Sequence, residues 1–230
     1  MLLLAVDTAT PQVSVALGED GRVRGEVRLA EGRRHAEQLA PAIAYLCEQT
    51  GVRLDALDAL AVGVGPGLFT GLRVGVTTVK VMAQALAVGV VAVPSLDLIA
   101  YPLRHARRVI AVVVDARRRE VFHATYRPVV GGVERVSEYR VEPAPQLAAA
   151  LAAAGEDVIL AGDGVDPYWS AFAGLECAEI AGPDFDAPSA AALVELATRR
   201  VARGDVEVPD AVRPLYLRES DAALAWGSAR

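Results

Sequence analysis

Short apolar runs alternate with turn signals along the first part of the chain, and this pattern predicts β-strands. Turn-forming residues at Asp7–Gln12 and Glu19–Gly21 join the first three runs as a meander, because Gly, Asp and Pro favour turns. These strands are expected at Leu2–Val6, Val13–Leu17 and Val23–Leu29.

An amphipathic helix is expected after the third strand, over His35–Gln49. Pro41 lies early in this segment and removes one backbone donor, so we expect a kink or a late start there. Gly51 ends the pattern. Apolar residues recur at i, i+4 and i+7 on one stripe, at Leu39, Ile43 and Leu46.

A glycine-rich segment, Gly63–Gly75, joins a short strand to a second helix, Thr70–Leu86. Glycine accepts positive φ and lets another backbone come close, Pro66 fixes the loop entry, and Thr70 is expected to cap the helix. The segment lacks the Gly-Lys-Ser/Thr of a Walker A motif. Amides at such a helix start suit an anion, but they can equally be capped internally. Both a phosphate cradle and a tight structural turn therefore remain open.

The pattern begins again in the second half of the chain. Ile110–Asp115 repeats Leu2–Asp7 as an apolar run ending in aspartate, and a β-rich run resumes six residues later in each half. Both halves then read βββ-α-β-Gly-x-Gly-α, which we interpret as an ancient duplication. Further strands are expected at Leu60–Val64, Val90–Val93, Val133–Val141 and Val158–Ala161, helices at Ser95–Arg104, Gln146–Ala153 and Pro188–Arg203, and a short extended run at Val212–Leu217.

Two βββαβα units, each with an aspartate after its first strand, indicate an α/β fold of the actin-like ATPase (ASKHA) architecture, with paired ribonuclease-H-like subdomains. We place the subdomains at 1–105 and 106–230, the second including the C-terminal helix and tail. Asp7–Thr10 resembles the first phosphate loop of that superfamily, but Ala9 stands where a glycine is common. The resemblance to the superfamily is weaker at the other two loops, because three arginines lie in the turn after Asp115 and the glycine run at 162–164 is shorter than usual. We therefore predict that the chain keeps the fold of the superfamily and has lost part of its nucleotide-binding site.

Composition narrows the class of protein. The net charge of −6 over 230 residues argues against tight stand-alone nucleic-acid binding. No apolar run approaches the roughly 18 residues of a membrane span, and Met1–Val6 lacks a basic leader, so we expect a cytoplasmic protein without membrane association. Arginines cluster at Arg104/Arg107/Arg108, Arg117–Arg119 and Arg199/Arg200/Arg203. These clusters could form a local basic patch, but we favour their interpretation as solvated helix ends and a turn.

The chain resembles the TsaB (YeaZ) family in several motifs spread from its first strand to near its C-terminus. The motifs are Asp7-Thr-Ala, Arg34–Pro41, Gly65–Gly75, Asp115–Val121 and Pro214–Arg218. The glycine loop and the Arg-His motif are the most specific. Residues singled out by the motifs are Asp7, Thr8, His35, Gly65, Pro66, Gly67, Thr70, Gly71, Arg73, Asp115 and Arg117.

The resemblance implies a non-catalytic subunit that pairs with the catalytic paralogue TsaD, with the ATPase TsaE joining them. It implies support of threonylcarbamoyl (t6A) transfer to adenosine 37 of ANN-decoding tRNAs, indirect contact with tRNA, and a homodimer when the chain is alone. TsaD carries a His-x-x-x-His metal pair where this chain has Pro94–Tyr101 without histidine. We therefore expect no catalytic residue, no metal and no cofactor. A weak nucleotide contact at the boundary with the partner would be compatible with this expectation.

The apolar stripes of the two first-half helices are expected to form the partner-binding face. From pattern alone, this interface and purely internal packing are about equally supported, and the resemblance favours the interface. The residues of the stripes are Leu39, Ile43, Leu46, Leu72, Val76, Val79 and Met82. The alternative is a small ATP-binding hydrolase of the actin-like superfamily, or a glycoprotease-like peptidase, using Asp7 and Asp115. His35 is interpreted as a hydrogen-bonded structural residue rather than a base.

Overall fold

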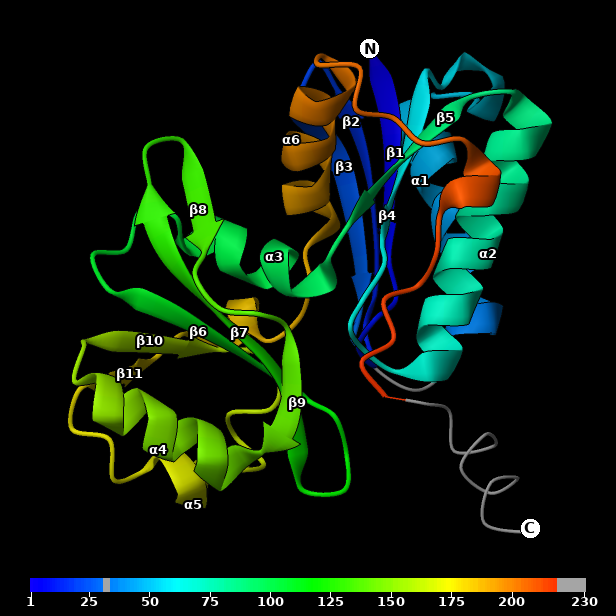
Figure 1. Ribbon diagram of the computed structural model, residues 1–230. Coiled ribbons are helices and arrows are strands. Elements are labelled where there is room, and N and C mark those ends of the chain that lie inside the picture. The colour runs from blue at the N-terminus through cyan, green and yellow to red at the C-terminus, as the bar shows by residue number, and fades with distance from the viewer. Residues whose placement is uncertain (31–33, 219–230) are drawn as a thin grey trace, which may run out of the picture.

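Two β-sheets organise the protein in this computed structural model, which describes residues 1–30 and 34–218 (Figure 1). The first sheet has the strand order β3-β2-β1-β4-β5; β1, β2 and β3 pair antiparallel, and β1, β4 and β5 pair parallel. Val6 stands opposite both Val15 of β2 and Val62 of β4. Paired residues point to the same face of a sheet and successive residues along a strand point to opposite faces, so these three valines share one face. The strands are β1 (Leu2–Asp7), β2 (Val13–Glu19), β3 (Arg22–Leu29), β4 (Ala59–Gly63) and β5 (Gly89–Val93).

The second sheet has the order β11-β10-β6-β7-β8, with β9 pairing the other end of β7. The single strand predicted at Val133–Val141 is two strands. Between them the Ser137 hydroxyl accepts a bond from the Thr125 amide, and this interrupts the ladder. The strands are β6 (Val109–Asp115), β7 (Glu120–Val129), β8 (Gly132–Arg135), β9 (Arg140–Pro143), β10 (Val158–Ala161) and β11 (Ala178–Ile180).

The helices confirm the predicted repeat, with two local corrections. The helix expected to kink or start late at Pro41 begins at His35. The glycine-loop helix begins at Phe69 after Leu68, and Thr70 lies exposed inside its first turn without a capping bond. The helices are α1 (His35–Thr50), α2 (Phe69–Leu86), α3 (Ser95–Ala100), α4 (Ala144–Ala154), the single turn α5 (Trp169–Phe172) and α6 (Ala190–Val201).

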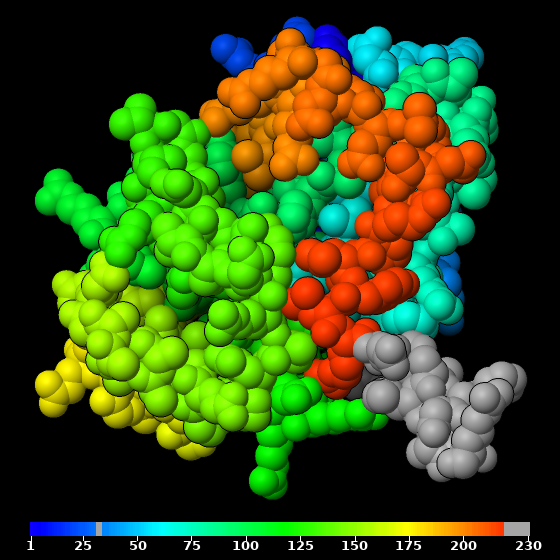
Figure 2. Space-filling view, in the orientation of Figure 1, coloured from blue at the N-terminus to red at the C-terminus, as the bar shows by residue number. Residues whose placement is uncertain are grey.

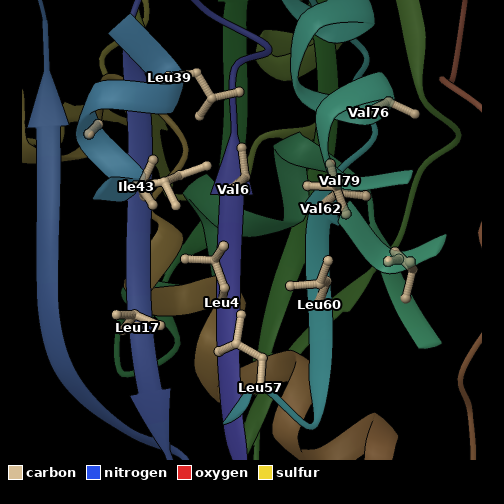
Figure 3. Packing of buried hydrophobic residues seen from close by; sticks show 14 of the residues in the cluster. Leu4, Val6, Leu17, Leu39, Ile43, Leu57, Leu60, Val62, Val76 and Val79 are labelled. Carbon is tan, nitrogen blue, oxygen red and sulfur yellow. The ribbon is translucent and has the colours of Figure 1, made fainter. Parts of the chain in front are cut away.

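Helices α1 and α2 cover one face of the first sheet, and their apolar stripes point inward. Figure 3 shows side chains of both helices directed at those of β1, β2 and β4. The structure thus corrects the choice of partner-binding residues: six of the seven are at most 5% exposed, and Met82 is partly buried against the same core. The six are Leu39, Ile43, Leu46, Leu72, Val76 and Val79.

The C-terminal helix α6 covers the opposite face of this first sheet. Leu193, Val194 and Ala197 pack in one core with alanines of β1 and β2. A Cβ atom on Gly18 would lie 2.2 Å from the Val194 side chain, so glycine permits the close approach. The sequence pattern groups this helix with the second subdomain. In space it completes the first lobe, so the 105/106 boundary does not separate the two packed units.

A C-terminal strap, residues 205–218, then returns along the first lobe. Glu207 bonds the edge strand β5 through Val90, and the Lys80 ammonium donates to the Val212 carbonyl at 3.2 Å. The run expected at Val212–Leu217 joins no strand ladder. Figure 2 shows the strap lying against both lobes. A disordered or contact tail predicted at 221–230 lies outside the described residues.

Candidate functional site

The loop after β1, Asp7–Thr10, packs directly against the glycine loop. The Thr8 hydroxyl donates to the Gly71 carbonyl at 2.8 Å, and the Leu68 amide donates to the Ala9 carbonyl at 2.7 Å. A Cβ atom on Gly67 would lie 2.2 Å from the Ala9 oxygen. These glycines are therefore explained by the close approach of two backbones, which a tight structural turn requires.

Asp7 lies beneath the two loops with both carboxylate oxygens engaged. Oδ1 accepts a bond from the Ala9 amide at 2.9 Å, and Oδ2 accepts one from the Ser95 hydroxyl at 2.6 Å. A Cβ atom on Gly63 would lie 1.7 Å from Oδ2, so the carboxylate occupies the space beside that glycine. Burial raises the pKa of Asp7 to about 6, against the lowering effect of the two hydrogen bonds.

Ser95 ties Asp7 to the entrance of the glycine loop. Its hydroxyl accepts a bond from the Gly65 amide at 3.0 Å, and its own amide donates to the Gly65 carbonyl at 2.7 Å. Gly65 has φ of +95°, which suits glycine, and it precedes Pro66 through a cis peptide bond. The sequence predicted Ser95 only as a helix start, because its partner Asp7 lies 88 residues away.

His35 closes the other side of this loop pair. Its ring is 4% exposed, and Nε2 lies 2.8 Å from the Thr10 carbonyl oxygen. The ring also faces Gly71, where a Cβ atom would lie 3.2 Å from Cε1. His35 is thus buried and hydrogen-bonded, as its interpretation as a structural residue expects, and that role stays a prediction.

Phe69, half-buried at the start of α2, packs on the strap. The Arg73 guanidinium lies 3.9 Å from the centre of the Phe69 ring, and this ring packs on Tyr216 with centroids 5.1 Å apart. The Leu215 amide donates to the Val64 carbonyl at 2.7 Å. The strap thus seals the end of β4, a role that the sequence pattern does not predict.

In the second lobe, Asp115 holds its own loop in place. Its carboxylate accepts bonds from the Arg117 amide and guanidinium, both at 2.7 Å, and from the Tyr168 hydroxyl at 2.9 Å. The three residues Arg117–Arg119 all have positive φ, at 63°, 55° and 65°. Such a turn is uncommon for residues with a Cβ atom, and the Asp115 bonds stabilise it.

Asp163 is mostly buried in the second lobe, much as Asp7 is buried in the first. Its Oδ1 accepts a bond from the Asp115 amide at 3.0 Å, and burial raises its pKa to about 6. The strap reaches this lobe through Arg218, which donates to the Ala116 carbonyl at 2.9 Å and pairs with Glu120 at 2.8 Å. The strap therefore joins the glycine loop to the Asp115 loop.

Neither a metal-binding cluster nor a membrane-spanning helix occurs within residues 1–30 and 34–218. In these ranges no group of three or more His, Cys, Asp or Glu side chains has an arrangement that could hold a metal ion. No helix there is long and apolar enough to cross a membrane.

The outward side of α2 that carries Val81 and Ala85 has no charged side chain, whereas the outward side of α1 also carries exposed Glu37 and Glu48, four residues from Pro41 and Ala44. Both helices follow strands that run in the same direction, so they run parallel, with His35 against Gly71 near both starts. Ten residues further along each helix lie Tyr45 and Val81, which are 56% and 58% exposed. We define the outer helix face as the exposed or half-buried residues Pro41, Ala44, Tyr45, Val74, Thr77, Thr78, Val81 and Ala85.

Comparison with known proteins relates the chain to tRNA modification. Residues 28–226 match the family model described as TsaD, tRNA N6-adenosine threonylcarbamoyltransferase. An uncharacterized protein of Mycobacterium tuberculosis is 35% identical over 96% of this chain and 93% of its own. The Escherichia coli tRNA threonylcarbamoyladenosine biosynthesis protein TsaB is 28% identical over 98% of this chain and 97% of its own.

Solved structures agree with this relationship and with the fold. YeaZ from Pseudomonas aeruginosa superposes with a TM-score of 0.81 at 33% identity, covering 94% of this chain and 99% of that one. The ethanolamine utilization protein EutJ of Carboxydothermus hydrogenoformans has a TM-score of 0.53 at 8% identity, covering 85% and 90% of the two chains, and it shows the fold alone. The predicted actin-like α/β architecture is confirmed.

Proposed function

Since this chain belongs to the TsaB (YeaZ) family, we propose that it is a non-catalytic scaffold subunit that pairs with the catalytic paralogue TsaD. In this role it supports threonylcarbamoyl transfer to adenosine 37 of ANN-decoding tRNAs in the cytoplasm, and TsaE joins the pair. A nucleotide contact at the TsaD boundary is compatible with the role, and none is required.

The outer helix face is the observation that carries this proposal. Helix α2 buries Val76 and Val79 inside the lobe, yet its opposite side presents Val81 and Ala85 with threonines between them and no charge. Half-buried Val74, at the edge of this side, also packs against the core of the lobe. A helix that is apolar on both sides favours burial on both sides. The parallel α1 continues the surface with Pro41, Ala44 and Tyr45. We infer that the equivalent helix pair of TsaD covers it, because paralogous faces are similar.

The geometry of the loop pair supports a role without chemistry. Both oxygens of Asp7 are engaged within the lobe, and Gly67 and Gly71 lie in contact with the Asp7–Thr10 loop. In the second lobe, Asp115 is engaged by Arg117 and Tyr168. The aspartates that would serve a nucleotide hydrolase therefore stabilise loops.

Charge on the outer helix face tests the pairing. We expect the chain alone to form a homodimer, because paralogous faces are similar, and to convert to a 1:1 heterodimer with TsaD of the same organism. Tyr45→Glu with Val81→Glu should abolish both species in size-exclusion chromatography with light scattering. Val129→Glu with Val130→Glu, two exposed valines of the second lobe, is the matched control and should leave both species intact.

Two outcomes would overturn the proposal. Co-elution of the Tyr45→Glu/Val81→Glu variant with TsaD would remove the outer helix face from the interface. ATP turnover or peptide cleavage by the isolated chain, abolished by Asp7→Asn, would instead support the hydrolase alternative.

A further inference from the structure

A groove between the two lobes gathers four arginines. It lies between the C-terminal half of α6 and the β7–β8 hairpin, has a volume of about 290 Å³, and is lined by Arg135, Arg199, Arg200 and Arg203. Three of these come from α6 and the turn that follows it in the first lobe, and Arg135 comes from β8 of the second lobe (Figure 1). The groove is therefore basic on both walls in a chain whose net charge is −6.

Hydrogen bonds to backbone carbonyls position two of the guanidinium groups, those of Arg199 and Arg200, and leave some of their N–H donors unused. Arg199 donates to the Gly131 carbonyl at 2.6 Å, and Arg200 donates to the Ala92 carbonyl at 2.8 Å. A guanidinium has five N–H donors, so each keeps others for a ligand. Positioned guanidinium groups lose little conformational freedom when they bind phosphate.

Arg203 is the least constrained of the four arginines, whereas Arg135 is held within its own hairpin, where its guanidinium also donates to the Ser137 carbonyl. Arg203 is exposed, and its side chain has no hydrogen bond or ion pair within the described part of the chain. Arg135 stacks 4.2 Å from the Tyr139 ring centre and lies 3.5 Å from Glu138, an exposed carboxylate.

Acidic groups near the groove do not cancel its charge. Asp97 is the one carboxylate in the lining, and its Oδ1 accepts bonds from the hydroxyls of Tyr126 and Tyr139, both at 2.8 Å. Asp205 lies 3.8 Å from Arg200 at the rim and is two-thirds exposed. Asp97 is mostly buried beneath the tyrosines and lies near Arg135 and Arg200, so one carboxylate faces four arginines in the lining.

We propose that this groove, the arginine groove, binds the phosphodiester backbone of tRNA. The proposal rests on the proposed function, which brings a tRNA to the complex. Planar guanidinium forks bind phosphate oxygens, like carboxylates, through paired hydrogen bonds, and contacts to phosphate position an RNA without reading its sequence. Because the four arginines span both lobes, a bound strand would bridge them.

Salt dependence of tRNA binding tests the groove directly. An unmodified tRNA transcript with an ANN-decoding anticodon is titrated, by fluorescence anisotropy, with the isolated chain and with its mixture with TsaD, between about 50 and 200 mM salt. Arg135→Ala with Arg203→Ala should weaken binding and flatten the slope of log K against log salt by about 1 for each phosphate that is no longer neutralised. Arg22→Ala with Arg107→Ala, two exposed arginines outside the groove, removes the same charge and should leave the slope within error of the wild type.

The outcomes separate this proposal from the scaffold role. Equal slopes for the two double variants, or no measurable tRNA binding by either preparation, would overturn the arginine groove while pairing with TsaD stands. Loss of pairing in light scattering would overturn the scaffold role, and the isolated chain would still report on the groove. Thermal unfolding of both double variants confirms that the comparison is between folded proteins.

Discussion

The Thr8 hydroxyl donates a hydrogen bond of 2.8 Å to the Gly71 carbonyl oxygen, while a Cβ atom on Gly71 would lie 2.2 Å from the Thr8 carbonyl oxygen. The two loops are thus in backbone contact, at the segment whose sequence resembles a phosphate loop. Residues that resemble a nucleotide site here stabilise the junction between β1 and α2.

This contact predicts a large effect of a single methyl group. Gly71→Ala should destabilise the protein by about 1–3 kcal/mol, because the obstructing atom is backbone and cannot move aside alone. Urea unfolding measures the change. Gly174→Ala, where a Cβ atom meets nothing within 4 Å, is the control and should change the free energy of unfolding by less than about 0.5 kcal/mol. Equal values for the two variants would contradict the loop packing.

Two valines of α2 test the inward and outward assignment of its faces. Val79 is fully buried and Val81 is 58% exposed, two positions apart on one helix. Val79→Ala should cost roughly 1.5–3 kcal/mol, because apolar area is returned to water and a cavity remains. Val81→Ala should stay within about 0.5 kcal/mol in the isolated monomer. Urea unfolding at a protein concentration below dimer formation gives both values, and a costly Val81→Ala would mean that the outer helix face is covered internally.

The pKa of Asp7 makes stability depend on pH. Its folded pKa of about 6 lies above the ordinary 3.8, so the folded state binds the proton more tightly and stability falls as pH rises from about 4 to 6. Asp163 shifts in the same direction, so the wild type contains both contributions. Asp7→Asn should remove one of them, on the order of 2–3 kcal/mol in relative stability between pH 4 and 7. Unfolding at four pH values measures it.

Ser95→Ala provides the matched variant for this titration. It removes the hydrogen bond that lowers the pKa of Asp7, so the fall in stability should extend to higher pH than in the wild type. A difference between Asp7→Asn and wild type that stays constant from pH 4 to 7 would show that Asp7 does not titrate in this range.

The strap depends on a ring contact at its end. Tyr216→Ala removes the packing on Phe69, and we expect faster hydrogen exchange at the Leu215 amide, whose bond to Val64 would open more often. Mass-spectrometric exchange of the peptide covering residues 212–218 measures this. Tyr45→Ala, which removes a more exposed ring on α1, should leave exchange of the strap unchanged. Unchanged exchange in Tyr216→Ala would mean that the strap is held by its other contacts.

The repeated βββαβα order was predictable from the chain because each half opens with an apolar strand that ends in aspartate. The position of α6 was not predictable, since its stripe of Leu193, Val194 and Ala197 would fit either sheet. What decides is the small side chains on the facing strands and Gly18, which leave room for a helix. These complementary residues lie far apart in sequence, and periodicity along one segment cannot pair them.

A similar limit explains why the sequence pattern assigned the buried sides of α1 and α2 to partner binding. A regular apolar stripe is the strongest periodic signal on a helix, and it marks the side that packs on the helix's own sheet. The outer helix face is less regular, with threonines among its valines and alanines. The bond from Ser95 to Asp7 left no local signal either, because serine after a proline is also an ordinary helix start.

The return of α6 to the first sheet constrains how the chain folds as it leaves the ribosome. The Ala190 amide bonds the Ser14 hydroxyl across 176 residues, so one face of the first sheet stays uncovered until nearly all of the protein has been made. Closing so long a segment is slow, although its entropic cost grows only with the logarithm of its length. During this interval the exposed alanine-lined face is open to aggregation or chaperones. A fragment ending at residue 105 would lack its second covering layer, and the two lobes are in this sense one cooperative unit.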